Sequence, residues 1–214
     1  ATFIEHIGSE IILRPYQFCN LSEVVIRSTD TEQDLERKVA IATILGTLQS
    51  TYTKFPYLRK VWEENTNEER LLGVSLTGIM DNPLTTTANP DLQGLLERLR
   101  AVSVEVNKEW AAKLGVAVST AITAVKPSGT VSQLVNSASG IHARHSEYYI
   151  RTVRGAYNDP LTEFMKDQGI PWEPCAHQPD TTVVFSFPQK SPKQAVLTEN
   201  TTAIEQLDTW LAYQ

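Results

Sequence analysis

The chain has 214 residues, a formal net charge of −6 and a hydrophobic share of 41%, values that suit a globular domain or part of a larger protein. The acidic balance excludes a surface that is basic overall, so we expect no nucleic-acid partner. No apolar run is long enough to span a bilayer, so we expect no membrane partner. The only two cysteines, Cys19 and Cys175, lie far apart, which favours a reducing compartment and predicts a cytoplasmic protein.

Hydrophobic patterning predicts strands that alternate with amphipathic helices. The expected strands are 10–13, 22–27, 116–125, 148–153 and 181–187, the last of a fully buried type that Pro188 closes. The expected helices begin after residues 31, 70, 89, 130, 159 and 202. This alternation favours parallel βα units in an α/β fold, either a barrel or an open doubly wound sheet.

Two local patterns make specific predictions about the helices. Thr66 and Glu69 have the spacing of a capping box ahead of an apolar segment, which predicts a helix over 71–79. Asp34 and Lys38 stand four residues apart in an amphipathic stretch, which predicts an ion pair on the outer face of a helix.

The stretch 126–132 is the strongest candidate for a binding site. It joins the strand expected over 116–125 to a helix start through a Pro-Ser-Gly-Thr turn. Such a turn leaves backbone N–H groups unpaired, and its glycine allows an anion to approach closely. Ser128 and Thr130 add hydroxyl groups, and Lys126 adds a positive charge. Because the same tetrapeptide is typical of an ordinary turn with a helix cap, phosphate binding and a structural turn both stay open.

Several longer blocks occur in the order found in one enzyme family. These blocks are residues 10–21, 55–59, 70–78, 125–132, 137–142 and 149–154. Across essentially its whole length, the chain resembles the adenosylcobalamin-dependent (class II) ribonucleotide reductases, most of all the monomeric ribonucleoside-triphosphate reductases. The resemblance implies that residues 1–214 are a single fragment of the catalytic domain, part of a ten-stranded α/β barrel, truncated at both ends.

The resemblance also implies an activity. The family reduces ribonucleotides, here expected to be triphosphates, to 2′-deoxyribonucleotides for DNA synthesis. Adenosylcobalamin initiates a thiyl radical, and thioredoxin is the reductant. By motif match, Glu10 corresponds to the glutamate that acts as base on the ribose 3′-hydroxyl, and Cys19 corresponds to a reducing cysteine. These residue types suit the chemistry, because a carboxylate accepts a hydroxyl proton and a thiol delivers hydrogen and ends as a disulfide.

Further positions take their expected roles from the same match. The turn that holds the substrate phosphates in the family corresponds to Pro127, Ser128, Gly129, Thr130 and Ser132. His142 and His145 have a spacing that a metal site could use, but no thiol or carboxylate cluster accompanies them. We therefore expect no metal and place His142 in a loop or against the cofactor. Arg151 and Arg154 are either salt-bridge residues at a strand end or contacts to a phosphate or cofactor.

The chain departs from the family at its first motif. The family has Asn-Pro-Cys-small-Glu, whereas residues 6–10 are His-Ile-Gly-Ser-Glu, so Gly8 replaces a cysteine. We therefore expect the fragment alone to have no turnover. One alternative is a catalytically inert nucleotide-binding remnant that lacks the partner cysteines. A weaker one is an unrelated phosphate-binding α/β enzyme, although the common glycine-rich nucleotide motifs are absent. From the residues alone, Cys19 could be a buried structural thiol and Glu10 an exposed charge.

Overall fold

The computed structural model describes residues 4–5, 12–126 and 128–213. It divides into two compact units: the first comprises Ala1–Arg144 with Gln194–Gln214, and the second comprises His145–Lys193. Glu10 and Pro127, two of the predicted site residues, lie outside the described residues. Among those that are described, no helix combines the length and the apolar character needed to cross a membrane.

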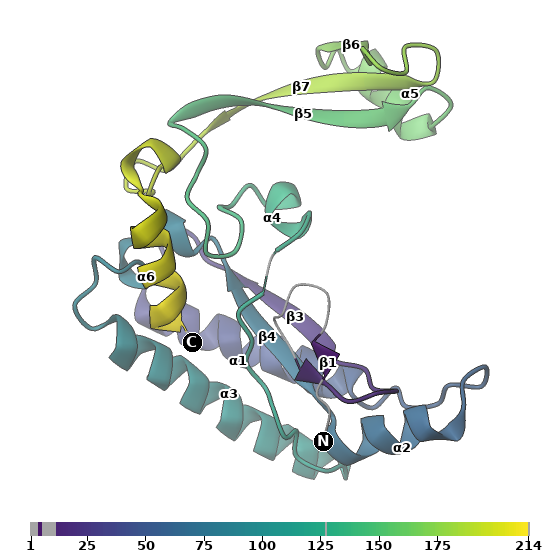
Figure 1. The fold of residues 1–214 in the computed structure, drawn as a ribbon, viewed down its shortest axis with the longest axis vertical. Helices are drawn as coiled ribbons and strands as arrows, with labels where there is room; N and C mark the ends of the chain where they lie inside the picture. Colours follow the sequence, from purple (N-terminus) through teal and green to yellow (C-terminus); the bar gives the residue numbers. More distant parts are fainter. Residues whose placement is uncertain (1–3, 6–11, 127, 214) are drawn as a thin grey trace. The chain divides into compact units, whose positions relative to one another are not determined.

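A parallel strand pair forms the centre of the first unit (Figure 1). β3 (Asn20–Val25) pairs in parallel with β4 (Leu72–Thr77) along their full lengths. Residues 120–124 run parallel to the other edge of β4 as an irregular third strand, with hydrogen bonds of 2.8 to 3.0 Å and one isolated bridge, Val74 to Thr123. β1 (Ile4–Glu5) and β2 (Ile12–Leu13) form a separate short antiparallel pair. The strand expected over 116–125 is therefore present only in part.

The helices of the first unit enclose its core on one face of this sheet (Figure 1). α1 (Glu32–Gln49) packs against β3 and β4, and α3 (Leu92–Leu114) packs beside α1. Side chains from these elements, among them Val24, Leu35, Leu72 and Leu95, form the buried apolar cluster. The remaining helical segments are α2 (Lys60–Glu69), η1 (Ile79–Asp81), η2 (Pro83–Thr85), α4 (Val131–Leu134), η3 (Thr198–Asn200) and α6 (Ala203–Tyr213).

The start of α1 confirms the predicted helix but corrects its ion pair. Thr31 and Asp34 form a reciprocal capping box, in which the Asp34 amide donates to Thr31 Oγ1 (3.2 Å) and the Thr31 amide donates to the Asp34 carboxylate (3.1 Å). Lys38 does not pair with Asp34; its ammonium bonds Asp30 Oδ2 (2.5 Å) and the Val25 carbonyl (3.0 Å). The expected Asp34–Lys38 pair was wrong: Asp34 is shared between the cap and Arg37 (3.6 Å), and Lys38 instead reaches Asp30 and the end of β3.

The cap makes the stability of the first unit depend on pH in the acidic range. Hydrogen bonds from the Thr31 side chain and backbone lower the pKa of Asp34. A carboxylate with a lowered folded-state pKa stabilises the fold above its unfolded-state pKa of about 3.9, and this contribution disappears as the pH falls through the folded-state value. We therefore expect Asp34→Asn to have the lower melting temperature at pH 7, and the difference from the natural chain to disappear as the pH falls through the lowered pKa of Asp34. Melting curves across this range test it, and a difference that is independent of pH contradicts it.

The segment predicted as a helix over 71–79 is instead β4, followed by η1. Thr66 lies inside α2, which ends at Arg70 in a left-handed conformation (φ 47°). β4 lies between β3 and residues 120–124, and five of its six residues are buried. A central strand of a parallel sheet is apolar along its whole length and lacks the alternation that identifies a half-buried strand. A short apolar run is therefore ambiguous between helix and strand, and the prediction chose wrongly.

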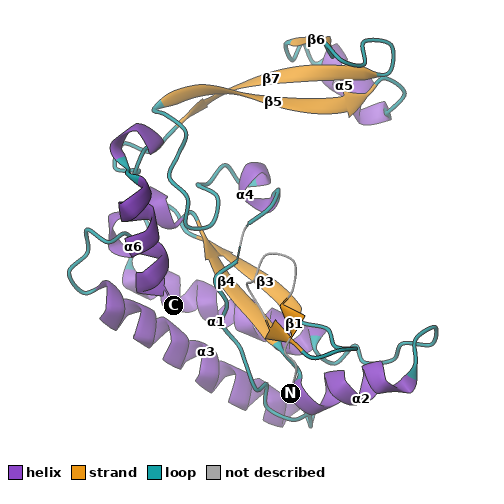
Figure 2. Cartoon of the chain, viewed as in Figure 1, coloured by secondary structure: helices purple, strands orange, loops and turns teal. Residues whose placement is uncertain are grey.

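The second unit is an antiparallel sheet with one helix (Figure 2). Its strands are β5 (Tyr148–Ala156), β6 (Trp172–Pro174) and β7 (Thr182–Lys190), in the order β5-β7-β6, and its helix is α5 (Pro160–Asp167). The prediction of parallel units is wrong here. Residues 175–181 are too short a connection between β6 and β7 to form the crossover that parallel strands need, so the two strands form a hairpin.

β7 is neither fully buried nor closed by Pro188. Only Val183 and Phe185 are buried, in the alternation typical of a sheet with one covered face. The strand continues through Pro188, which stands opposite Ile150 of β5. Proline is tolerated there because β6 pairs with β7 only from Trp172 to Pro174, so the other edge of β7 at Pro188 makes no ladder bond to β6.

These elements confirm the α/β class. The described residues form one parallel pair with an irregular third strand and two small antiparallel sheets. A closed ten-stranded barrel is not shown by this part of the chain. The barrel and the assignment of residues 1–214 to one catalytic domain therefore stay predictions.

Candidate functional site

The predicted phosphate turn follows the irregular third strand. The Ser132 amide donates to Ser128 Oγ (2.9 Å), and the Val131 amide donates to the Ser128 carbonyl (3.3 Å). Gly129 has φ +59°, and a Cβ there would meet no atom within 4 Å. Gly129 and Thr130 are exposed, and neither amide has an acceptor within the part of the chain that the structure describes. The turn thus presents two N–H groups and the Thr130 hydroxyl to solvent.

Glu23 of β3 fixes this turn. Its Oε1 accepts a hydrogen bond from Ser128 Oγ (2.7 Å), and its Oε2 pairs with Lys126 Nζ (2.6 Å). The Lys126 and Glu23 side chains are 9% and 8% exposed. Ser22 and Leu72 lie against Gly46 of α1, so Glu23, one residue further along β3, points to the other face of the sheet. Sequence reasoning gave Lys126 to the phosphate and missed Glu23, since the two partners are 103 residues apart.

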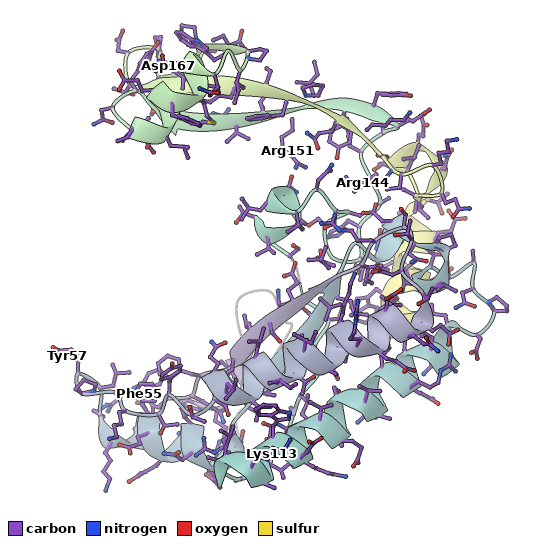
Figure 3. All side chains as sticks on the ribbon, turned by 180° about the vertical axis from the view of Figure 1, so that it is seen from behind. Phe55, Tyr57, Lys113, Arg144, Arg151 and Asp167 are labelled. Carbon is purple, nitrogen blue, oxygen red and sulfur yellow. The ribbon has the colours of Figure 1, made fainter. Side chains whose placement is uncertain are left out.

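A buried ion pair fixes the loop that follows the turn. Arg144, labelled in Figure 3, donates from Nε to Asp81 Oδ1 (2.7 Å) and from Nη2 to Asp81 Oδ2 (2.8 Å). Both side chains are 3% exposed. Asp81 Oδ2 also accepts the Ala138 amide (2.8 Å), and Arg144 donates to the side chain and the carbonyl of Asn136. One carboxylate and one guanidinium therefore hold the loop from residue 136 to residue 144.

The same loop is bonded to the carboxyl ends of both parallel strands. Thr77, the last residue of β4, donates to the Ala138 carbonyl (3.1 Å) and accepts from the Gly140 amide (2.8 Å). Arg27, just after β3, donates to the Val135 carbonyl (2.5 Å). The turn and the loop after it therefore lie where the carboxyl ends of parallel strands meet, which is the usual place of a site in such folds.

Cys19 lies at the opposite end of β3 from the turn. It immediately precedes the strand and is half-buried. Alternation along an extended chain puts Cys19 on the same side as Glu23, at a distance of about 13 Å along the strand. The neighbouring Phe18 packs its ring against Trp62, with centroids 4.6 Å apart. Cys19 and Cys175 do not form a disulfide with each other.

Two other candidate positions in the second unit have local contacts. Arg154 and Cys175 interact within that unit: backbone hydrogen bonds from His177 and Gln178, with a smaller contribution from Arg154, lower the pKa of the buried Cys175 thiol. Arg151 stands in β5 opposite Phe187, with its guanidinium 6.0 Å from the centre of the Tyr149 ring. The strand was predicted to end at residue 153, but β5 continues to Ala156, so both arginines lie within the strand and not at its end.

His142 is exposed, and its amide donates to the Ser139 carbonyl (2.8 Å). A cavity of about 530 Å³ in the first unit is lined mainly by residues of β4, α3, α6 and 123–125, and not by His142. Adenosylcobalamin is larger than the drug-sized ligands that fill cavities of about 300–1,000 Å³. This cavity is therefore too small for that cofactor. Within the same residues, no group of three or more His, Cys, Asp or Glu side chains could hold a metal ion.

The chain is similar in sequence to known proteins of one kind. No family model matches the chain. The adenosylcobalamin-dependent ribonucleoside-triphosphate reductase of Euglena gracilis is 29% identical over 195 residues, which cover 91% of this chain and 26% of that protein. The enzyme of the same name from Lactobacillus gasseri is 30% identical over 210 residues, covering 85% and 27%. This chain is homologous to one segment of these reductases.

The resemblance inferred from the motifs is thus confirmed, and the chain spans about a quarter of the length of the curated reductases it matches. A solved B12-dependent (class II) ribonucleotide reductase also matches in structure, with a TM-score of 0.77 and 24% identity over 95% of this chain and 32% of that one. At this identity the structural match concerns the fold alone.

Proposed function

We propose that this chain is a segment of a cytoplasmic ribonucleotide reductase, in which it binds the ribonucleotide and contributes part of the reducing chemistry. The parent enzyme would convert ribonucleoside triphosphates, in keeping with the names of its relatives, to 2′-deoxyribonucleotides for DNA synthesis. The observation that carries the proposal is the sequence similarity to reductases of that name over 85 to 91% of the chain. The absence of nucleic-acid and membrane partners is part of the same proposal.

The phosphate turn would bind the nucleotide. The amides of Gly129 and Thr130 and the Thr130 hydroxyl are donors that face solvent, as a phosphate needs. Ser128 and Ser132, which are buried, support the turn from inside through their 2.9 Å hydrogen bond. With the phosphates held near Glu23, the ribose would extend along β3 towards Cys19, which lies about 13 Å from Glu23 along the strand. Binding energy from the phosphates would in this way position the sugar.

Cys19 would supply one of two thiols that reduce the ribose. In that step the C2′–O bond breaks, Cys19 and a second thiol that this chain lacks at position 8 lose two hydrogen atoms and form a disulfide, and one of these hydrogens ends on C2′ while the other leaves with the 2′-hydroxyl as water. Thioredoxin would then reduce the disulfide of the parent enzyme, and Glu10 would act as base on the 3′-hydroxyl. Adenosylcobalamin, when bound, supplies the radical that starts the reaction. His142, which is exposed, is proposed as a contact to that cofactor.

A second candidate function is a nucleotide-binding remnant without catalysis, which is favoured by Gly8 in place of the family cysteine. Binding and turnover distinguish the parts of the proposal. We expect the 214-residue chain to bind a ribonucleoside triphosphate in calorimetry. We expect it to bind the corresponding nucleoside, which lacks phosphate, only weakly. We expect no deoxynucleotide when adenosylcobalamin and a dithiol are added. Cys19→Ser is the control, because the thiol is at the far end of β3 and its loss should leave phosphate binding unchanged. Absence of nucleotide binding would overturn the proposed function.

A further inference from the structure

Glu23 compensates the charge of the cation closest in sequence to the phosphate turn. Its carboxylate pairs with Lys126 at 2.6 Å, and both side chains are more than 90% buried. Two further cations contact residues beyond the far end of α4: Arg27 donates to the carbonyls of Val135 and Asn136, and Arg144, which is paired with Asp81, donates to Asn136. The turn itself is therefore close to neutral, even though a lysine immediately precedes it.

Glu23 also determines which groups of the turn can reach a ligand. A hydroxyl has one proton, and that of Ser128 is donated to Glu23 Oε1 (2.7 Å) while its oxygen accepts the Ser132 amide. Ser128 consequently has no proton left for a phosphate. The donors that remain within the described turn are the amides of Gly129 and Thr130 and the Thr130 hydroxyl, all without formal charge.

We infer that Glu23 is a specificity-determining residue of the phosphate turn, which binds its ligand through neutral donors because Glu23 holds Lys126 and Ser128 away from it. The inference rests on the proposed nucleotide binding. An uncompensated lysine at this position would attract any anion, and its attraction would depend strongly on salt. A neutral turn instead favours a ligand whose phosphate oxygens fit the directions of its N–H and O–H groups. Glu23 thus lowers the affinity of the turn for anions in general and makes binding depend on how well the phosphate oxygens fit its donors.

Three variants test the charge arrangement, with inorganic tripolyphosphate and a ribonucleoside triphosphate as probes in calorimetry. Glu23→Gln keeps an acceptor for Ser128 but leaves Lys126 charged, so we expect it to bind tripolyphosphate about fivefold to tenfold more tightly at low salt. Lys126→Met leaves Glu23 uncompensated and should weaken binding by a similar factor. The double variant is neutral again and should bind like the natural chain.

A direct contact between Lys126 and phosphate gives a different pattern. In that case the double variant would bind as weakly as Lys126→Met, and the inference would be overturned. Thr130→Val provides a second measurement on an exposed residue that does not depend on the folding of the Glu23 variants. We expect it to weaken binding severalfold, because it removes one of the neutral donors, and unchanged binding would also overturn the inference. If the natural chain bound neither probe, the proposed function would fail first, and the inference with it.

Discussion

Replacement of Arg144 by methionine should lower the free energy of unfolding of the first unit by about 3–5 kcal/mol, the usual cost of removing one partner of a buried ion pair. Asp81 would keep its negative charge in a site where the side chain is 3% exposed. The Ala138 amide would be the one remaining donor to that carboxylate among those described. Denaturant unfolding followed by circular dichroism measures the effect.

Two further variants identify the cause of that loss. Asp81→Asn combined with Arg144→Met removes both charges but keeps an acceptor for the Ala138 amide, so it should recover much of the stability lost in Arg144→Met. Arg98→Met is the matched surface control, since Arg98 also bridges two carboxylates, those of Asp91 and Glu32, with 42% of its side chain exposed. Its effect should be far smaller. Equal losses for Arg98→Met and Arg144→Met would contradict the importance given to burial.

Local signals in the sequence predicted the parts of this structure that depend on neighbouring residues. The starts of α1 after Thr31 and of α6 after Thr202 were both found from short patterns. The turn before α4 was also found this way, because its strand, small residues and helix start are contiguous; its role in binding phosphate stays a prediction. Each of these features is determined by backbone hydrogen bonds within a few residues.

The contacts that fix the candidate site could not be found by the same means. Glu23 meets Lys126 across 103 residues, and Asp81 meets Arg144 across 63. A charged residue in a strand looks the same in sequence whether it faces solvent or a buried partner, because only the tertiary fold chooses between the two. The misassigned β4 has a related cause, since its burial on both faces comes from strands distant in sequence and removes the alternation that would have identified it.

Gly78 is the glycine whose replacement should be least tolerated among those the structure describes, because two independent costs coincide there. It lies directly after β4 with φ +80°, which costs a residue with a side chain about 1–2 kcal/mol. A Cβ at this position would also lie 2.6 Å from the Ile26 carbonyl oxygen, a backbone atom that cannot turn aside. We therefore expect Gly78→Ala to lower the free energy of unfolding by clearly more than the conformational cost alone, about 3 kcal/mol or more.

Gly115→Ala separates the two costs. Gly115 has a similar φ of +66°, but a Cβ there would meet no atom within 4 Å, so its replacement should cost only about 1–2 kcal/mol. The difference in unfolding free energy between the two variants then measures the cost of the close approach between Gly78 and the Ile26 carbonyl. The Gly78 amide also donates to the Ala138 carbonyl (2.9 Å) of the loop beyond the phosphate turn. Gly78→Ala should accordingly weaken nucleotide binding as well, whereas Gly115→Ala should not. Equal losses of stability in the two variants would show that the close approach at Ile26 relaxes without cost, and that the strand ends tolerate more movement than their hydrogen bonds imply.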